Sequence, residues 1–292
     1  MAYFVLVVTL LIWSGSFLAA RWARESLSVG EALAARFVPV LVSALLLIAW
    51  RWKSVRQLPR AAWGKIVWMG ILSVPVYNLF FFMAMKDVAT GTAALIIATN
   101  PVFTALLAAP LLGEPFGKRR AGGLLLGLAG VFIVIRYGIS AGAGASLAVH
   151  YWRSALLLLL APLSWAGYTI IGKSLPADCN RLDASLAQLV IGSAPLAFFF
   201  TPSLGHTLMA HPLALWSSLY LGLLCTLFGF AAWLWALGRL SATQTAAFVF
   251  LNPPLANLWA WLLGETHLTP VYLLGAALLL CGVGLIVFGR KA

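Results

Sequence analysis

The sequence predicts an all-α integral membrane protein with ten transmembrane helices, arranged as two five-helix repeats of opposite orientation. Composition is the first observation: 63% of the 292 residues are hydrophobic and only 9% are charged, with a mean hydropathy of +0.99. Such values are typical of chains that cross a membrane many times. The second observation is an Asn-Pro pair in the middle of two apolar stretches, at matching places in the two halves.

Ten stretches are long and apolar enough to cross a bilayer, because about 20 helical residues span about 30 Å of hydrocarbon. They are expected at residues 3–20, 30–50, 64–85, 90–112, 119–136, 153–172, 183–201, 213–236, 243–263 and 268–288. The first stretch has no basic leader and is followed by Arg21, so we expect an uncleaved helix rather than a signal peptide. The Gly-, Ala- and Ser-rich segment 138–150 is expected to link two repeats, residues 1–146 and 147–292.

The two halves resemble each other at a constant shift of 152 residues. The aligned pairs include Trp13 with Trp165, Gly70 with Gly222, Asn100 with Asn252, and Gly130 with Gly282. Each half holds five spans, and an odd number makes the second copy enter the membrane from the opposite side. We therefore expect inverted repeats, the symmetry that alternating access uses.

Charge predicts the orientation of the chain in the membrane. Most of the 19 Lys and Arg residues fall in segments on the same side as the N-terminus, such as residues 51–65 and 118–120. Cytoplasmic loops are enriched in these residues, so both termini are expected in the cytoplasm. The net charge of +12 lies in short clusters between apolar spans, which favours a lipid bilayer and no nucleic acid as partner. Compact loops and an excess of Arg over Lys indicate a bacterial inner membrane protein.

Two spans are interrupted in the middle. Thr92–Glu114 contains Asn100 and Pro101, and residues 245–265 contain Asn252 and Pro253. Proline has no N–H to donate within a helix, and such a break is tolerated in a membrane only against protein or a wet cavity. Paired broken helices are a sequence-level pointer to a transporter's substrate site. Pro101 and Pro253 are therefore expected to act as hinges.

Polar and aromatic residues concentrate in the first, third, fourth, sixth, eighth and ninth spans, whereas the fifth and tenth contain mainly Gly and apolar residues. The GxxxG pair Gly123 and Gly127 predicts close helix packing in the fifth span. We expect the substrate site to be formed by Trp13, Tyr77, Asn78, Asn100, Trp165, Tyr168, Trp233 and Asn252. For the asparagines the alternative is a structural hydrogen bond between helices, and for the aromatic residues it is packing.

Missing charges narrow the substrate class. No Asp or Glu lies in the middle of a span, which argues against exchange of organic cations for protons. Arg36 is the only deep basic residue, too few for a polyanion, so a neutral or zwitterionic solute is favoured. Arg36 itself could extend to the surface, pair with Glu31 or face a substrate carboxylate. Glu114 and Glu265 end the fourth and ninth spans, where helix-end contacts are favoured over roles in transport.

Several other functions are not supported by the sequence. The cysteine count is odd, and two of the three cysteines lie in apolar spans, so no disulfide is expected. There is no metal-ligand cluster, nucleotide-binding loop or intramembrane catalytic pair, so we expect neither a cofactor nor an enzyme. Ten helices can enclose a cavity alone, which makes a monomer the expected state.

Several short motifs occur together in this chain: WSGSF in the first span, ARF in the second, ATGTAALI and NP in the fourth, and GE ending the fourth and ninth. Taken together, these motifs resemble the drug/metabolite transporter superfamily, in its EamA-like branch. The resemblance implies a basket-like bundle around a central cavity, with the fifth and tenth helices outside it. It also implies export of amino acids or related metabolites. The small four-helix multidrug relatives carry an essential glutamate in their first helix, which this chain lacks.

The expected function is export of neutral amino acids, with aromatic or large apolar side chains, by alternating access. The aromatic richness is similar to that of bacterial aromatic amino acid exporters. An exporter of other small metabolites or amphipathic drugs is the alternative. The sequence leaves open whether transport is facilitated diffusion or proton exchange.

Overall fold

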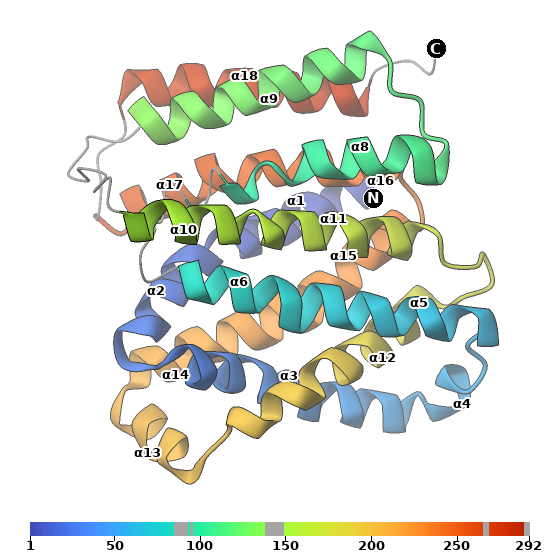
Figure 1. The fold of residues 1–292 in the computed structure, drawn as a ribbon, viewed down its shortest axis with the longest axis vertical. Helices are drawn as coiled ribbons and strands as arrows, with labels where there is room; N and C mark the ends of the chain where they lie inside the picture. The colour runs from blue at the N-terminus through green and yellow to red at the C-terminus, as the bar shows by residue number, and fades with distance from the viewer. Residues whose placement is uncertain (85–92, 94–95, 138–148, 265–268, 289–292) are drawn as a thin grey trace.

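The protein is described here by a computed structural model covering residues 1–84, 93, 96–137, 149–264 and 269–288. Every regular element in these ranges is helical. The helices lie side by side in one bundle, and α1 begins and α18 ends at the same end of it (Figure 1). Segment 138–150, expected as the linker, lies mostly outside the described residues, as does Glu265.

Within the described residues, the first half of the chain contains three long apolar helical stretches, two of them interrupted, followed by two further helices. Its elements are α1 (Ala2–Ser14), α2 (Ser16–Ser26), α3 (Val29–Trp50), α4 (Trp52–Val55), α5 (Arg60–Ile71), η1 (Leu72–Val76), α6 (Tyr77–Ala84), α8 (Asn100–Leu112) and α9 (Lys118–Tyr137).

The second half is built in a similar way. Its elements are α10 (Val149–Leu158), α11 (Leu160–Lys173), α12 (Arg181–Ser193), η2 (Ala194–Phe199), α13 (Pro202–Ala210), α14 (Pro212–Leu219), η3 (Tyr220–Phe228), α15 (Gly229–Leu237), α16 (Ala242–Ala247), η4 (Phe248–Leu251), α17 (Asn252–Leu262) and α18 (Pro270–Val287).

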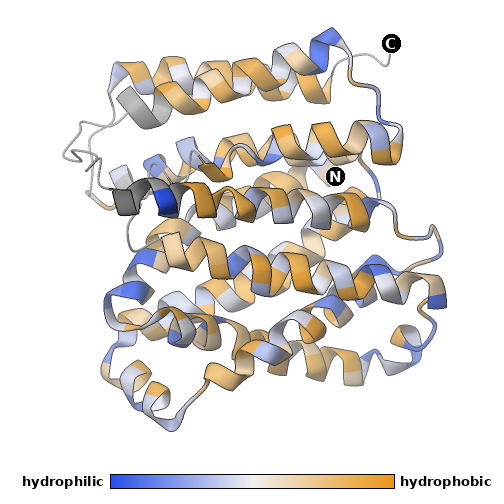
Figure 2. Ribbon diagram, in the orientation of Figure 1, coloured by the Kyte–Doolittle hydropathy of each residue, from blue (hydrophilic) through white to orange (hydrophobic). Residues whose placement is uncertain are grey.

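Seven stretches are long and apolar enough to cross a membrane: Ala2–Ser26, Val29–Trp50, Arg60–Ala84, Leu156–Lys173, Arg181–Phe199, Pro212–Leu237 and Pro270–Val287. α8 is apolar but shorter. Hydrophobic residues run along the lengths of the helices and hydrophilic residues gather toward their ends (Figure 2). The prediction of an all-α membrane protein is therefore confirmed, with seven candidate membrane spans among the described residues.

The helix breaks predicted at the Asn-Pro pairs are present. α8 begins at Asn100 after a turn at residues 98–99, and α17 begins at Asn252 after the 3₁₀ segment η4. Each proline therefore stands in the first turn of a new helix, where its missing N–H leaves no internal bond unmade. The interruption precedes the proline in both cases.

Two π-helical segments are further interruptions, and the sequence analysis did not anticipate them. η1 contains Pro75, and η3 is the longer of the two. At the shift of 152 residues, η1 falls within η3, so the two halves are interrupted at matching places. π-helical turns are rare and frequently occur at functional sites.

α9 and α18 pack against each other along one side of the bundle (Figure 1). Their contact depends on glycine: a Cβ on Gly282 would lie 2.7 Å from the carbonyl oxygen of Gly123 and 2.7 Å from the amide nitrogen of Gly127. A Cβ on Gly130 would lie at the same distance from the carbonyl oxygen of Gly275. The GxxxG pair thus lies at a helix–helix contact, as small residues in membrane helices commonly do.

This packing predicts different effects for two glycines on one helix. Gly282→Val should lower the free energy of unfolding by about 1–3 kcal/mol, because the backbones of α9 and α18 must separate. Gly284→Val is the matched control, since a Cβ there meets nothing within 4 Å. Thermal unfolding of both variants in detergent measures the difference, and equal shifts would contradict the packing.

Candidate functional site

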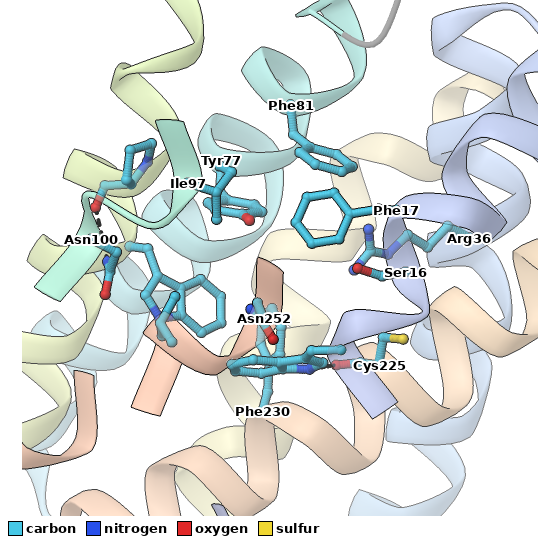
Figure 3. A pocket seen from close by; sticks show the side chains of 14 residues that line it. Ser16, Phe17, Arg36, Tyr77, Phe81, Ile97, Asn100, Cys225, Phe230 and Asn252 are labelled. Carbon is cyan, nitrogen blue, oxygen red and sulfur yellow. Dashed lines mark hydrogen bonds between the residues drawn. The ribbon is translucent and has the colours of Figure 1, made fainter. Parts of the chain in front are cut away.

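A cavity in the middle of the bundle brings together residues from both halves of the chain. Its empty volume, counted together with the open space at its mouth, is about 630 Å³. Five of the eight residues expected in the substrate site line it: Trp13, Tyr77, Asn100, Trp165 and Asn252. They come from five different elements, and Figure 3 labels Tyr77, Asn100 and Asn252 among the side chains around the cavity.

Trp165 of α11 is the centre of the aromatic wall. Its ring centroid lies 5.2 Å from that of Trp13, 5.3 Å from that of Tyr77 and 5.0 Å from that of Phe230, in edge-to-face arrangements. Such contacts are favoured by the ring quadrupoles and fix the rings relative to one another. The indole N–H of Trp165 is buried without a hydrogen-bond partner in the described structure.

Trp13 is held in place from the opposite half. Its indole N–H donates to the carbonyl oxygen of Cys225 over 2.7 Å. Gly229 makes the approach possible, because a Cβ at that position would collide with the indole nitrogen. The cavity wall is therefore formed by a contact between α1 and the η3–α15 region that only a glycine permits.

Three residues expected in the site do not line the cavity. Tyr168 and Trp233 are fully buried behind it, with ring centroids 4.8 Å and 5.8 Å from that of Trp165. The hydroxyl of Tyr168 accepts a hydrogen bond from Gln188. Both aromatic residues thus support the wall through Trp165.

Asn78 serves the backbone instead. Its amide nitrogen donates to the carbonyl oxygens of Ser73 and Val74, over 3.1 Å and 2.9 Å. These carbonyls belong to η1, where Pro75 and the π-helical geometry disturb regular hydrogen bonding. Asn78 is fully buried and satisfies backbone acceptors that would otherwise be costly in a membrane.

The two asparagines of the Asn-Pro pairs have different environments. Asn100 donates to the carbonyl oxygen of Pro162 over 3.1 Å and so ties α8 to α11. Asn252 lines the same cavity, but its side chain makes no hydrogen bond to the described residues. Its carbonyl oxygen Oδ1 is buried and without a partner. Of the two, Asn252 is the one with an unused polar group.

The sequence left three roles open for Arg36: extension to the surface, pairing with Glu31, or a position facing the substrate. The structure distinguishes between them. It is 6% exposed, lines the cavity, and donates from Nε and Nη2 to the hydroxyl oxygen of Thr226, over 3.1 Å and 3.0 Å. It therefore does not extend to the surface. Glu31 is engaged elsewhere, in a capping box with Ser28 at the start of α3.

Several residues that line the cavity were not expected in the substrate site from the sequence, among them Ser16, Phe17, Phe81, Cys225 and Phe230. Ser16, Phe81 and Phe230 carried a usable signal, since they are polar or aromatic residues in cavity-forming spans. Nothing in the sequence distinguished Cys225 from the apolar residues around it. Only the packing of η3 against α1 brings it to the cavity wall.

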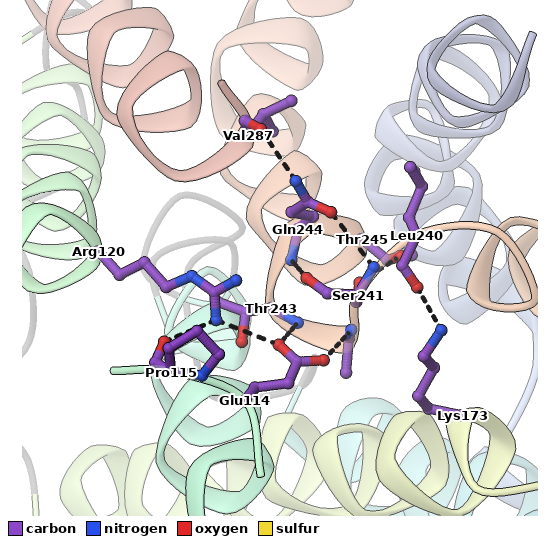
Figure 4. Close-up of polar contacts among 11 residues, drawn as sticks. Glu114, Pro115, Arg120, Lys173, Leu240, Ser241, Thr243, Gln244, Thr245 and Val287 are labelled. Carbon is purple, nitrogen blue, oxygen red and sulfur yellow. Dashed lines mark hydrogen bonds and ion pairs between the residues drawn. The ribbon is translucent and has the colours of Figure 1, made fainter. Parts of the chain in front are cut away.

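The end of the bundle at which α1 begins is tied across the two halves. Glu114, after the end of α8, accepts hydrogen bonds from the amides of Ala242 and Thr243 over 2.6 Å and 3.3 Å (Figure 4). A carboxylate is favoured at a helix N-terminus by the free N–H groups and the helix dipole. The helix-end role favoured for Glu114 is therefore observed, at a helix of the other half.

Two further contacts join the halves at this end. Arg51 pairs with the fully buried Asp183, at 2.6 Å between Nε and Oδ1, and Ser54 also donates to Asp183. The hydrogen bond to Asp183 raises the pKa of Arg51 above its usual value. Lys65 donates to the carbonyl oxygen of Ser174 over 2.5 Å. Together with Glu114, these groups join the two halves of the chain at this end.

The described residues give no sign of metal or disulfide chemistry. No group of three His, Cys, Asp or Glu side chains within the described ranges is arranged to hold a metal ion. Cys179, Cys225 and Cys281 are all free, as the sequence analysis expected.

Apolar helices around a cavity of aromatic and amide groups define a multi-pass membrane protein, and comparison with known families identifies which class. The model of the EamA-like transporter family matches residues 1–136 and again residues 152–288. These two matches cover most of the chain. The protein therefore belongs to the EamA-like transporter family.

Individual relatives agree with this assignment. The chain is 31% identical to a probable terminal-alkyne amino-acid exporter of Streptantibioticus cattleyicolor, over 99% of this chain and 95% of that protein. It is 26% identical to a probable amino-acid metabolite efflux pump of Escherichia coli K12, over 98% and 94% of the two chains. A crystal structure with 21% identity shares the fold, with a TM-score of 0.76 over 98% and 96% of the two chains.

The difference between the two asparagines predicts different effects on stability. Asn100→Ala should lower the free energy of unfolding by about 1 kcal/mol, because a buried hydrogen bond between α8 and α11 is lost. Asn252→Ala removes an unpaired buried oxygen and should leave stability unchanged or slightly higher. Thermal unfolding in detergent without added solute tests this, and an equal loss for both would contradict the assigned contacts.

Proposed function

We propose that this protein exports neutral amino acids with aromatic or large apolar side chains, by alternating access. The observation that carries the proposal is the cavity between the two halves, with its wall of Trp13, Tyr77, Trp165 and Phe230. Aromatic walls suit apolar side chains, and a few polar groups orient the bound molecule. The two relatives named as exporters of amino acids or their metabolites support the same substrate class.

The proposed architecture is ten transmembrane helices in two inverted repeats, residues 1–146 and 147–292, with both termini in the cytoplasm of a bacterium. The double match to one family model supports two repeats. The π segments and the helices starting at Asn100 and Asn252 also correspond at a shift of 152 residues. We propose that the protein lies in the bacterial inner membrane and is a monomer.

Alternating access requires that the contacts closing one end break while the substrate stays bound. Glu114, Arg51 and Lys65 each reach across to the other half at the end where α1 begins, which we assign to the cytoplasm. We take this conformation to be the one that is closed toward the cytoplasm. Pro101 and Pro253, in the first turns of α8 and α17, are the proposed hinges.

Transport of phenylalanine tests the proposed function directly. Purified protein in proteoliposomes should accumulate labelled phenylalanine by counterflow, with tryptophan competing better than threonine or an organic cation. Competition by the cation alone would favour an exporter of amphipathic drugs and contradict the amino acid proposal. A pH gradient that leaves the rate unchanged would favour facilitated diffusion, whereas strong acceleration would favour proton exchange.

The aromatic wall predicts the effect of a single substitution. Trp165→Ala should lower the rate of phenylalanine counterflow at least about 10-fold, because three cavity rings lose their common contact. Trp68→Ala is the matched control, since Trp68 is 58% exposed on the outside of the bundle. Equal rates for the two variants would place the substrate site elsewhere.

The contact between the halves predicts a change in hydrogen exchange. Glu114→Ala should speed exchange of the amides of Ala242 and Thr243, because their acceptor is lost, at a cost of about 1 kcal/mol to the helix start. Glu31→Ala is the control, as it removes a capping box within one half. If exchange in α16 is unchanged in the Glu114 variant, this contact does not hold the end closed.

A further inference from the structure

Arg36 is a buried cation with unused hydrogen-bond donors. A guanidinium has five N–H groups, and the bonds from Nε and Nη2 to Thr226 occupy two of them. Among the described residues no carboxylate lies within ion-pair distance of Arg36, and no other side chain or backbone group accepts from it. An ionised side chain inside a membrane protein is costly unless it is paired or functional.

The direction of the guanidinium is fixed by η3. The hydroxyl of Thr226 donates to the carbonyl oxygen of Leu221 over 2.8 Å, so its oxygen is oriented to accept from Arg36. Gly222 brings η3 against α3, because a Cβ there would collide with the carbonyl oxygen of Arg36. With Nε and one N–H of Nη2 bonded to Thr226, both N–H groups of Nη1 and the second N–H of Nη2 remain for the cavity. The parallel N–H groups of Nη1 and Nη2 match the geometry of a carboxylate.

A complementary group lies in the same cavity. Asn252 Oδ1 is a buried acceptor without a donor, whereas Arg36 is a donor without a sufficient acceptor. Figure 3 shows both side chains facing the space between the aromatic rings. A free α-amino acid carries a carboxylate that can accept from Arg36 and an ammonium that can donate to Asn252 Oδ1. Asn100, the counterpart of Asn252, is already bonded to Pro162.

We propose that Arg36 binds the α-carboxylate of the transported amino acid and that Asn252 Oδ1 accepts a hydrogen bond from its α-ammonium. This assignment rests on the proposed function and adds the group by which the cavity recognises its substrate. The side chain of the substrate then lies against Trp13, Tyr77 and Trp165. A compound without the carboxylate leaves the buried guanidinium unpaired, so the cavity selects free amino acids against amides and amines of the same shape.

Wild-type protein provides the first test. In the phenylalanine counterflow assay, phenylalaninamide and phenethylamine should compete at least about 100-fold more weakly than unlabelled phenylalanine, because they leave buried donors unpaired. Equal competition by phenylalaninamide would overturn the role of Arg36 while leaving amino acid transport intact. Absence of any amino acid transport would instead remove the proposed function, and this assignment with it.

Variants assign the two ends of the substrate separately. Arg36→Gln should reduce the preference for phenylalanine over phenylalaninamide to less than about 10-fold, and Arg36→Lys should keep part of it, because its charge remains without the fork. Asn252→Ala should weaken phenylalanine binding but leave that preference unchanged. Thr226→Val should also reduce the preference for phenylalanine over phenylalaninamide, but less than Arg36→Gln does. Thr226→Ser keeps the hydroxyl and should keep the wild-type preference.

Each result decides the assignment. An unchanged preference in a folded Arg36→Gln protein overturns it, as does loss of the preference in Asn252→Ala alone. If Arg36→Gln does not fold, Arg36→Lys and the wild-type competition still decide, because neither depends on removing the positive charge. A structural role for Arg36 would lower the amount of folded protein but would not change the ratio between the two competitors.

Discussion

The requirement that every backbone polar group inside a membrane find a partner within the protein shapes the centre of this structure. The chain breaks its helices at Gly15, in η1, in η3, and before Asn100 and Asn252. Each break frees carbonyl or amide groups that lipid cannot satisfy. The breaks can therefore exist only where other helices surround them, and those in η3 and before Asn100 and Asn252 contribute residues to the cavity.

Side chains complete the hydrogen bonding at these breaks and, in doing so, position the cavity. Asn78 and Thr226 bond to carbonyls of η1 and η3, and Tyr220 donates to the carbonyl oxygen of Ile12 beside the break at Gly15. Thr226 then orients Arg36 toward the cavity. The same polar groups that make the interrupted helices stable in a membrane thus determine the polar lining of the site.

The two halves share the interruptions at the π-helical segments and before the Asn-Pro pairs, and they differ in their side chains. Asn100 is bonded to α11, whereas its counterpart Asn252 has an unpaired oxygen. Arg36 corresponds to Gln188, which bonds to Tyr168 behind the aromatic wall. A symmetric frame can support motion of one half against the other, while asymmetric side chains give a single bound molecule one orientation. The difference in polar partners is therefore as informative as the repeat.

The sequence by itself determined the all-α membrane class and the two Asn-Pro helix starts, because hydropathy and proline chemistry are local properties of the chain. The constant shift of 152 residues predicts the repeat. It also identified the aromatic residues Trp13, Tyr77 and Trp165, which the structure brings to one cavity. It did not distinguish cavity residues from supporting ones: Asn78, Tyr168 and Trp233 have the same residue types and lie behind the wall. Only the tertiary structure decided the role of Arg36, since its partner Thr226 is 190 residues away and meets it through the packing of η3 against α3.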